Sequence, residues 1–177
     1  MHFVVFDLET KNSFDDVGGQ QNRHKLGVSV GVVYDSKSDT TTAYREEQMD
    51  DLVDHLHNAE LVVGFNSFGF DYPVLQPYTI LTLDQLPGLD LMVELTNVLG
   101  HRVSLDSVAQ GTLNAEKSAE GLQAIRWYRE GEWDKLIAYC EQDVLITKDI
   151  YLFGKENGHV KFYDRFQRRI RNVDVNW

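Results

Sequence analysis

The chain has 177 residues, 42% of them apolar and 11% aromatic, and a formal net charge of −11. This length and composition support a single domain, residues 1–177, with a sizeable core. The single cysteine, Cys140, excludes an internal disulfide and any zinc or iron–sulfur site built from several thiolates. The acidic balance argues against a protein that grips nucleic acid with its whole surface, because Lys and Arg supply most non-specific affinity for phosphates.

The N-terminus has no basic segment before an apolar core, and no apolar run approaches the roughly 18 residues that a membrane span needs. We therefore expect a soluble, unsecreted protein without a membrane partner. One free cysteine is compatible with a reducing, cytoplasmic location.

The first half of the chain is predicted to form strands interrupted by one helix. Residues 3–6 are continuously apolar, as in a central strand that is covered on both faces. Further strands are predicted at residues 26–34, 40–45 and 61–63. A polar turn at 35–39 makes the first two of these an antiparallel hairpin, and helical apolar spacing predicts a helix over 46–58. This order indicates an α/β fold with mixed strand directions.

The second half is predicted to be mainly helical. Residues 89–99 fit either a strand or a helix, and periodicity does not decide between them. Helices are expected at 105–110, 119–129 and 133–153. Ser104 is the expected N-cap of the first, Gly131 separates the other two, and the glycines at 154 and 158 end the last.

Two carboxylates stand two residues apart where the first strand ends. Because side chains alternate along a strand, Asp7 and Glu9 project from one face, and Phe6 and Leu8 from the other. Adjacent negative charges on a buried strand are costly unless something positive is bound. The simplest explanation is an active site that holds a divalent metal ion.

Asp71 has an ordinary and a functional interpretation. It precedes Pro73, so it fits the N-cap of a helix that begins with a proline in its first turn. It also follows the strand at 61–63, whose carboxyl end would meet Asp7 and Glu9 if that strand is parallel to the first.

Asp143 also has two interpretations. It lies four residues after Tyr139 on the expected last helix, so the two share a face. Three apolar residues are expected to continue that face: Leu136, Ile146 and Ile150. Asp143 is then either an ordinary boundary residue or an acid that needs a metal or hydrogen-bond partner. Glu141 and Asp149 are expected to point to solvent.

Three segments carry a family resemblance: residues 6–10, residues 64–66 with 71–75, and residues 139–143. In order and separation they resemble the three motifs of the DEDD, or DnaQ-like, 3′→5′ exonuclease superfamily. The Tyr-x-x-x-Asp form of the third segment is similar to the tyrosine (DEDDy) subclass, seen in proofreading domains of family B DNA polymerases and in predicted bacterial relatives. The resemblance covers about residues 1–153. It implies an RNase H-like α/β fold, with a central mixed sheet of about five strands flanked by helices.

The resemblance also implies a metal-dependent 3′→5′ exonuclease that hydrolyses phosphodiester bonds at the 3′ end of DNA or RNA, with single-stranded DNA favoured. It assigns two divalent ions, Mg²⁺ or Mn²⁺, to Asp7, Glu9, Asp71 and Asp143 in a two-metal-ion mechanism. Tyr139 would orient the attacking water, because a Tyr with a pKa of about 10 is a poor general base.

Substrate contacts are expected near the first two segments. Leu8 and Thr10 flank the acidic pair, where the resemblance places contacts to the terminal nucleotide. Asn66 matches a polar position of the second segment and is equally compatible with a turn. Four aromatic residues surround that segment: Phe65, Phe68, Phe70 and Tyr72. An exposed ring there, such as Phe70, could stack on the last base, although aromatic residues at this density usually belong to the core.

Two other functions remain open: a catalytically weak module of the same fold that binds nucleic acid or acts as a scaffold, and an RNase H-type endonuclease. The presence of all four acids and Tyr139 favours activity, because an inactive site has no electrostatic reason to keep acids that repel one another.

Basic residues concentrate at the C-terminus. Five of the 17 lysines and arginines are Lys161, Arg165, Arg168, Arg169 and Arg171. The basic tail, about residues 159–177, fits a solvated helix end, a surface that contacts a nucleic-acid strand, or a junction to a partner. Because the rest of the chain is acidic, we expect strand affinity to come partly from a helicase, polymerase or repair partner.

Overall fold

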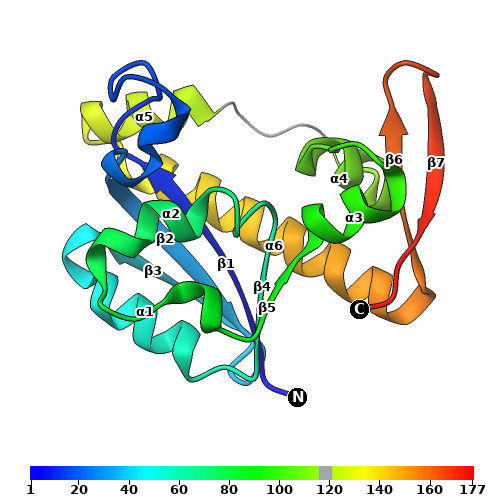
Figure 1. The fold of residues 1–177 in the computed structure, drawn as a ribbon, viewed down its shortest axis with the longest axis horizontal. Coiled ribbons are helices and arrows are strands. Elements are labelled where there is room, and N and C mark those ends of the chain that lie inside the picture. Colours follow the sequence, from blue (N-terminus) through cyan, green and yellow to red (C-terminus); the bar gives the residue numbers. More distant parts are fainter. Residues whose placement is uncertain (116–120) are drawn as a thin grey trace.

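The computed structural model describes residues 1–115 and 121–177. Its main sheet has the strand order β3-β2-β1-β4-β5 (Figure 1). The strands are β1 (Phe3–Thr10), β2 (Val28–Asp35), β3 (Thr40–Arg45), β4 (Leu61–Gly64) and β5 (Gly88–Asp90). β1 is antiparallel to β2 and parallel to β4, and β4 is parallel to β5. The predicted mixed α/β sheet of five strands, with β1 at its centre, is confirmed.

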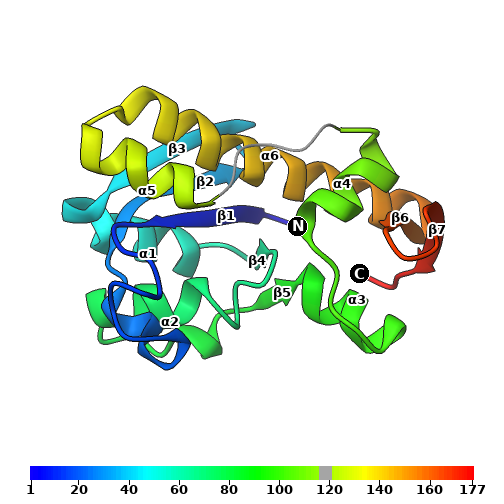
Figure 2. The same cartoon turned by 90° about the horizontal axis from the view of Figure 1, so that it is seen from above.

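Helices cover both faces of this sheet. The α-helices of the described residues are α1 (Met49–His57), α2 (Asp71–Leu75), α3 (Leu91–Leu99), α4 (Leu105–Leu113), α5 (Gly121–Glu130) and α6 (Trp133–Asn157). Short 3₁₀ turns are η1 (Gln20–Lys25), η2 (Glu46–Gln48), η3 (Gln76–Tyr78) and η4 (Leu83–Gln85). Figure 2 shows α1 and α2 on one face of the sheet and α5 and α6 on the other. Within the described part of the chain, no helix has the length and apolarity to span a bilayer.

The two faces of β1 belong to two separate cores. Val5 packs in the core beneath α6, whereas Phe6 and Leu8 pack in the core against α1 and α2. The alternation along the strand therefore places Asp7 and Glu9 together, as the sequence predicted, and the packing of Val5 puts them on the α6 side.

The ambiguous stretch 89–99 contains both kinds of structure. Leu89 lies in β5, and α3 begins at Leu91. The carboxylate between them, on Asp90, accepts hydrogen bonds from the N–H groups of Met92 and Val93 at 3.0 and 3.2 Å. This N-cap starts the helix, since it satisfies backbone donors that the first turn leaves without a partner.

The other predicted helices form with shifted ends. Ser104 caps α4 by accepting from the Ser107 N–H at 3.2 Å, as expected. The helix expected over 46–58 begins as η2 before it becomes α1. Residues 119 and 120 of the helix expected over 119–129 lie outside the described residues. α6 is four residues longer than predicted and ends at Gly158, which has the left-handed φ of 68° that glycine tolerates best.

The buried face of α6 differs slightly from the predicted stripe. Its buried residues include Leu136, Cys140, Val144, Thr147 and Ile150. Tyr139, Asp143 and Ile146 are half-buried beside this stripe rather than on it. The expectation that Glu141 points to solvent is wrong, because its carboxylate accepts a hydrogen bond from the Thr41 hydroxyl of β3.

The basic tail is a β-hairpin, β6 (His159–Asp164) and β7 (Arg169–Asp174), so its interpretation as a helix end is wrong. Gly111 of α4 lets β6 approach closely, since a Cβ there would lie 2.6 Å from the backbone N and Cα of Phe162. Beyond β7, the Trp177 indole lies against Gly154 and donates to the Tyr151 carbonyl at 3.0 Å. Contacts with two helices thus hold the hairpin in place.

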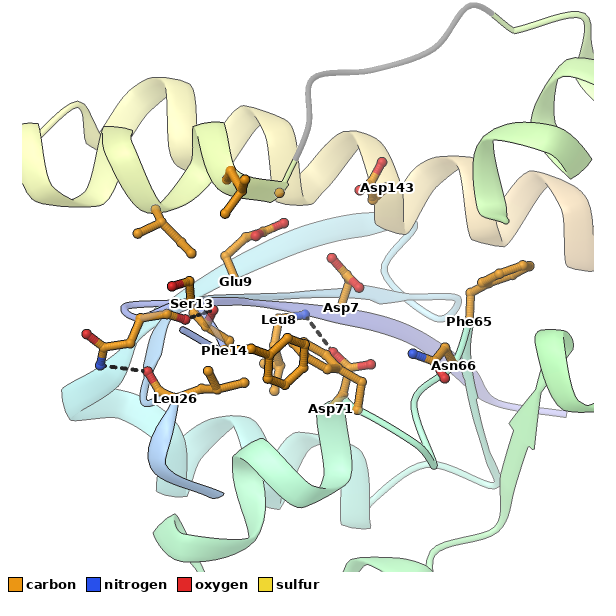
Figure 3. A pocket seen from close by; sticks show the side chains of 16 residues that line it. Asp7, Leu8, Glu9, Ser13, Phe14, Leu26, Phe65, Asn66, Asp71 and Asp143 are labelled. Carbon is orange, nitrogen blue, oxygen red and sulfur yellow. Dashed lines mark hydrogen bonds between the residues drawn. The ribbon is translucent and has the colours of Figure 1, made fainter. Parts of the chain in front are cut away.

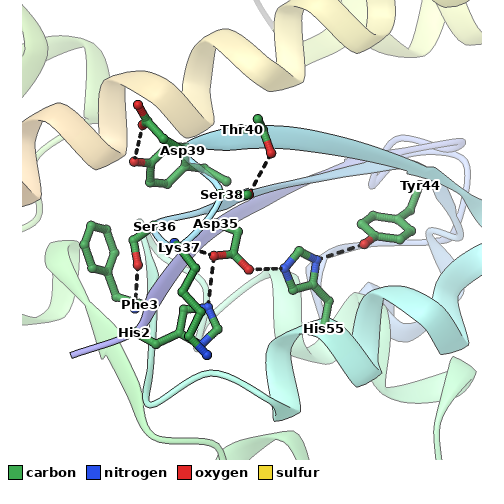
Figure 4. A network of polar contacts seen from close by, with 11 residues as sticks. His2, Phe3, Asp35, Ser36, Lys37, Ser38, Asp39, Thr40, Tyr44 and His55 are labelled. Carbon is green, nitrogen blue, oxygen red and sulfur yellow. Dashed lines mark hydrogen bonds and ion pairs between the residues drawn. The ribbon is translucent and has the colours of Figure 1, made fainter.

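A polar network joins the start of β1 to α1 (Figure 4). Asp35, at the end of β2, contacts the Nε2 atoms of His2 and His55, each at 3.0 Å, and the His55 Nδ1 lies 2.8 Å from the Tyr44 hydroxyl. Burial raises the pKa of Asp35, but hydrogen bonds from His55, the Lys37 N–H and His2 outweigh it and lower that pKa to about 2. The ionised carboxylate therefore stabilises the fold.

Replacing Asp35 with Asn should lower the free energy of unfolding at pH 7 by roughly 2 kcal/mol. The folded-state pKa lies below the ordinary value of 3.8, so this stabilisation is present above about pH 4 and is lost as the pH falls toward 2. Urea unfolding of the wild type and the variant at pH 7 and at pH 2.5 measures this loss in the free energy of unfolding. Asp50→Asn, at an exposed position, is the matched control. An equal loss at both pH values would contradict the assignment.

Candidate active site

The acidic end of β1 extends beyond its parallel neighbour. β4 pairs with β1 only from Phe3 to Val5, so nothing in β4 pairs with the backbone at Leu8. The Leu8 N–H instead donates to Asp71 Oδ1 at 3.2 Å. Asp71 is the first residue of α2, whose N-cap is Phe70, so the interpretation of Asp71 as an N-cap is wrong. Its carboxylate is aimed at β1.

The loop between β4 and α2 is held by an acid that the sequence analysis missed. Asp90 is 1% exposed, and its two oxygens accept from the N–H groups of Asn66 and Phe68 at 2.8 and 3.0 Å. Asn66 has a left-handed φ of 66°, so it is the turn residue that one interpretation expected. The position of Asp90 directly before an apolar run was the available signal for an N-cap. Its hydrogen bonds to the loop at Asn66 and Phe68 could be seen only in the tertiary structure.

The four predicted acids meet at one pocket of about 280 Å³ (Figure 3). Its lining includes eight of the nine predicted site residues: Asp7, Leu8, Glu9, Thr10, Asn66, Phe70, Asp71 and Asp143. β1 supplies the first four, the β4–α2 loop and α2 the next three, and α6 the last. The parallel pairing of β1 and β4 brings these segments to the same edge of the sheet.

Tyr139 lies next to this pocket rather than in its lining. Its ring is half-buried and packs edge-on against Trp127 of α5, with the centroids 5.9 Å apart. Burial and the charges of Asp143, Glu9 and Asp7 raise the pKa of its hydroxyl well above the ordinary value. The hydroxyl therefore stays protonated at neutral pH and can donate a hydrogen bond.

Burial, followed by mutual repulsion, raises the pKa values of the acids in the pocket. Burial, followed by the charge of Asp143, raises the pKa of Asp7 well above its ordinary value. Burial and the charges of Asp7, Asp143 and Asp71 do the same for Glu9. The pKa of Asp71 is also raised, by burial and by Asp7. These carboxylates are close enough to destabilise one another when all are ionised.

The donor set fits a hard divalent cation. Oxygen atoms of Asp7 and Glu9 lie within 4.8 Å of each other and of the Cys140 sulfur. Carboxylate oxygens are the ligands that Mg²⁺ and Mn²⁺ prefer, and a cation here would stabilise the ionised acids against both burial and repulsion, the two causes that raise the three pKa values. Asp71 and Asp143 approach this pair from the two sides of β1 (Figure 3).

Cys140 of α6 lies beside the acids, a position that its local sequence did not indicate. Its thiol lies 3.4 Å from the Asp7 carbonyl oxygen and 3.8 Å from Asp7 Oδ2. Burial and the nearby carboxylates raise the pKa of this thiol well above its ordinary value, so it remains a neutral donor. It supports the backbone at Asp7 and is not an activated nucleophile.

Three aromatic residues of the second segment divide between core and pocket, and the fourth, Phe68, is 41% exposed outside both. Tyr72 is buried and stacks on Phe6 with 5.8 Å between ring centroids, so it belongs to the core. Phe65 and Phe70 line the pocket, and Phe70 meets Phe14 edge-on at 6.1 Å. Two apolar residues of α5, Leu122 and Ile125, complete the wall. The pocket thus combines an acidic floor with apolar sides.

Comparison with known proteins agrees with this architecture. A family model of the RNase H superfamily matches residues 4–153. No curated protein matches the chain. Among solved structures, the chain is similar to the family B DNA polymerase from the hyperthermophilic archaeon Pyrobaculum calidifontis, with 18% identity and a TM-score of 0.66. The match covers 88% of this chain but 24% of the polymerase chain, so the chain spans about a quarter of that protein. The expected RNase H-like α/β fold is therefore confirmed.

Proposed function

The chain belongs to the RNase H superfamily, and on that premise we propose that it is a metal-dependent 3′→5′ exonuclease of the DEDDy type. Membership of this superfamily supports nuclease activity in general, a nucleic-acid substrate and the use of divalent metal ions. The polarity, the exonucleolytic mode and the preference for single-stranded DNA belong to the proposal.

One observation carries the proposal: Asp7 and Glu9 of β1, Asp71 of α2 and Asp143 of α6 converge on one pocket. The three segments keep the order and separation of the exonuclease motifs, with Tyr139 one helical turn before Asp143. The pocket volume of about 280 Å³ is close to that of small-ligand sites, so it can hold part of a terminal nucleotide.

We assign the binding of two Mg²⁺ or Mn²⁺ ions to these four carboxylates. When bound, such ions supply Lewis-acid charge that activates water and stabilises the departing 3′ oxygen. The four carboxylates would determine where the metal charge lies. The hydrogen bond from the Leu8 N–H holds the carboxylate of Asp71 beside β1. On this proposal Phe70 and Phe65 contact the terminal base, and Leu8, Thr10 and Asn66 contact other parts of the terminal nucleotide.

Replacing Tyr139 with Phe should lower kcat by roughly 10- to 100-fold, the equivalent of one hydrogen bond to the attacking water. Because the hydroxyl does not ionise near neutral pH, the wild-type rate should show no downward break from Tyr139 below about pH 10. Steady-state rates from pH 6 to 10 test both statements. Tyr44→Phe, outside the pocket, is the control, and an unchanged kcat in Tyr139→Phe would remove Tyr139 from the mechanism.

A time course on 5′-labelled single strands of DNA and RNA, with Mg²⁺, Mn²⁺ or EDTA, tests the proposed activity. A ladder that shortens one nucleotide at a time from the 3′ end supports a 3′→5′ exonuclease. Internal cuts in an RNA–DNA hybrid would instead support an RNase H-type endonuclease. Binding without hydrolysis in every metal would identify a catalytically weak module.

A further inference from the structure

The tip of the C-terminal hairpin gathers positive charge on an acidic protein. Residues 165–171, which join β6 to β7 and begin β7, contain four arginines and no acidic residue, although the whole chain carries −11. Arg171 is neutralised by Asp164 at 3.1 Å. Across residues 1–115 and 121–177, no ion pair or hydrogen bond occupies the side chains of Arg165 and Arg168, which are both exposed.

An aromatic ring stands between these arginines. Phe166 is 101% exposed at the turn, so its ring gains nothing from burial and belongs to neither core. The turn itself is well defined, because Asp164 Oδ1 accepts from the N–H groups of Phe166 and Gln167, each at 3.0 Å. Exposed cations interleaved with a bare aromatic ring suit the phosphates and bases of a single strand.

Arg102 connects this tip to the acidic pocket. Its guanidinium donates to Asn66 Oδ1 at 2.8 Å, and Asn66 lines that pocket. Arg102 and His101 also line a second pocket, of about 180 Å³, together with Arg165 and Phe166. Arg102 therefore borders both hollows, and cationic groups continue from one to the other.

The span matches a short stretch of nucleic acid. Asp143 lies near the middle of α6, and the hairpin begins just after that helix ends, at His159 (Figure 2). At 1.5 Å per residue, the base of the hairpin lies roughly 20 Å from Asp143 along the helix axis. A strand therefore has to extend several nucleotides upstream of its 3′ end before it reaches the tip, which lies at the far end of β6.

We propose that the hairpin tip and Arg102 form the binding track for the single strand that lies upstream of the 3′ end. Arg102, Arg165 and Arg168 contact phosphates of this strand, and Phe166 stacks on one of its bases. The charge of the track offsets the acidity of the remaining surface, so the enzyme retains a strand while the pocket processes its end. This inference rests on the proposed function for the direction of the strand, but the binding track can be tested without hydrolysis.

Two double variants with the same change in charge test the track. Arg165→Gln/Arg168→Gln removes two of its cations, and Lys37→Gln/Lys135→Gln removes two exposed cations elsewhere. Binding of a labelled strand of about 20 nucleotides is measured in EDTA by fluorescence anisotropy at several salt concentrations. The track variant should bind at least about tenfold more weakly, with a salt slope lower by about 1.4, since each contact to single-stranded phosphate contributes about 0.7. Phe166→Ala should weaken binding about tenfold with the salt slope unchanged.

Hydrolysis then gives a second readout. The track variant should raise KM for the long strand about tenfold but degrade a dinucleotide, which is too short to reach the hairpin, at the wild-type rate. Wild-type affinity in the track variant, or an equal loss in the lysine control, would overturn the track. If no variant hydrolyses either strand while the track variant alone loses affinity, the proposed activity fails and the binding track stands.

Discussion

Replacing Asp143 with Asn should lower the rate of phosphodiester hydrolysis by roughly 10³-fold, because the loss of one carboxylate weakens metal charge that stabilises the transition state by several kcal/mol. Asp143 is half-buried, and its charge is felt by both Asp7 and Glu9, so it belongs to the same electrostatic unit. Loss of a mutually repelling charge should leave the fold intact. Single-turnover rates and circular dichroism of the same preparation measure the two effects.

Asp149→Asn is the matched control for this variant. Asp149 lies on the same helix, is exposed, and pairs with Lys148 at 3.1 Å, so its loss makes the same chemical change away from the pocket. Its hydrolysis rate should equal that of the wild type. Full activity in Asp143→Asn would refute the assignment of the acids as ligands.

Divalent metal should stabilise the protein, and more strongly as the pH rises. At an ion concentration 100 times the dissociation constant, one bound ion adds about 2.7 kcal/mol to the free energy of unfolding. For a chain of this size that corresponds to an increase in Tm of roughly 5–10 °C. Thermal unfolding with EDTA, Mg²⁺ and Mn²⁺ at pH 5.5 and pH 8 measures it.

The direction of the pH effect follows from the raised pKa values of Asp7, Glu9 and Asp71. Without metal, the folded protein holds protons that the unfolded chain has already released, so its stability falls as the pH rises above the ordinary carboxyl range. A bound cation prefers the ionised acids, and the increase in Tm is therefore larger at pH 8 than at pH 5.5.

The Asp7→Asn variant distinguishes the effect of the acidic cluster on stability from the effects of other titrating groups. In EDTA at pH 8 this variant should be more stable than the wild type, because it removes a buried charge that two neighbours repel. It should also lose most of the metal response. The exposed Asp50→Asn should behave like the wild type. If millimolar metal leaves the Tm of the wild type unchanged at pH 8, a metal site in this pocket is contradicted.

Much of the fold could be read from local patterns. The continuous apolar run of β1, the turn between β2 and β3 and the glycine at the end of α6 all act through neighbouring residues, so their positions were predicted closely. The basic tail was harder. Its first strand packs against Gly111 of α4, which lies far away in sequence, and Trp177 beyond its second strand packs against Gly154 of α6.

The site was predictable to a similar degree. Each acid could be named from its own segment, but Asp71 fitted a helix cap equally well until the Leu8 N–H was seen to be its partner. Asp90 accepts from the Asn66 N–H, and the Cys140 thiol donates to the Asp7 carbonyl oxygen. Neither contact could be predicted from the local sequence. Arg102 gave no sequence signal either, since its bond to Asn66 joins residues 36 positions apart.

By itself the sequence determined most strands and helices before residue 159, with 89–99 left open, and that Asp7 and Glu9 share one face, because periodicity and capping act over a few residues. Tertiary structure alone decided that β4 ends early enough for Asp71 to reach β1, that α6 brings Asp143 to the same pocket, and that a basic hairpin stands at the far end of that helix. The physical reason is that charge repulsion and metal affinity depend on distances of a few ångströms between side chains, and only the packing of distant segments sets those distances.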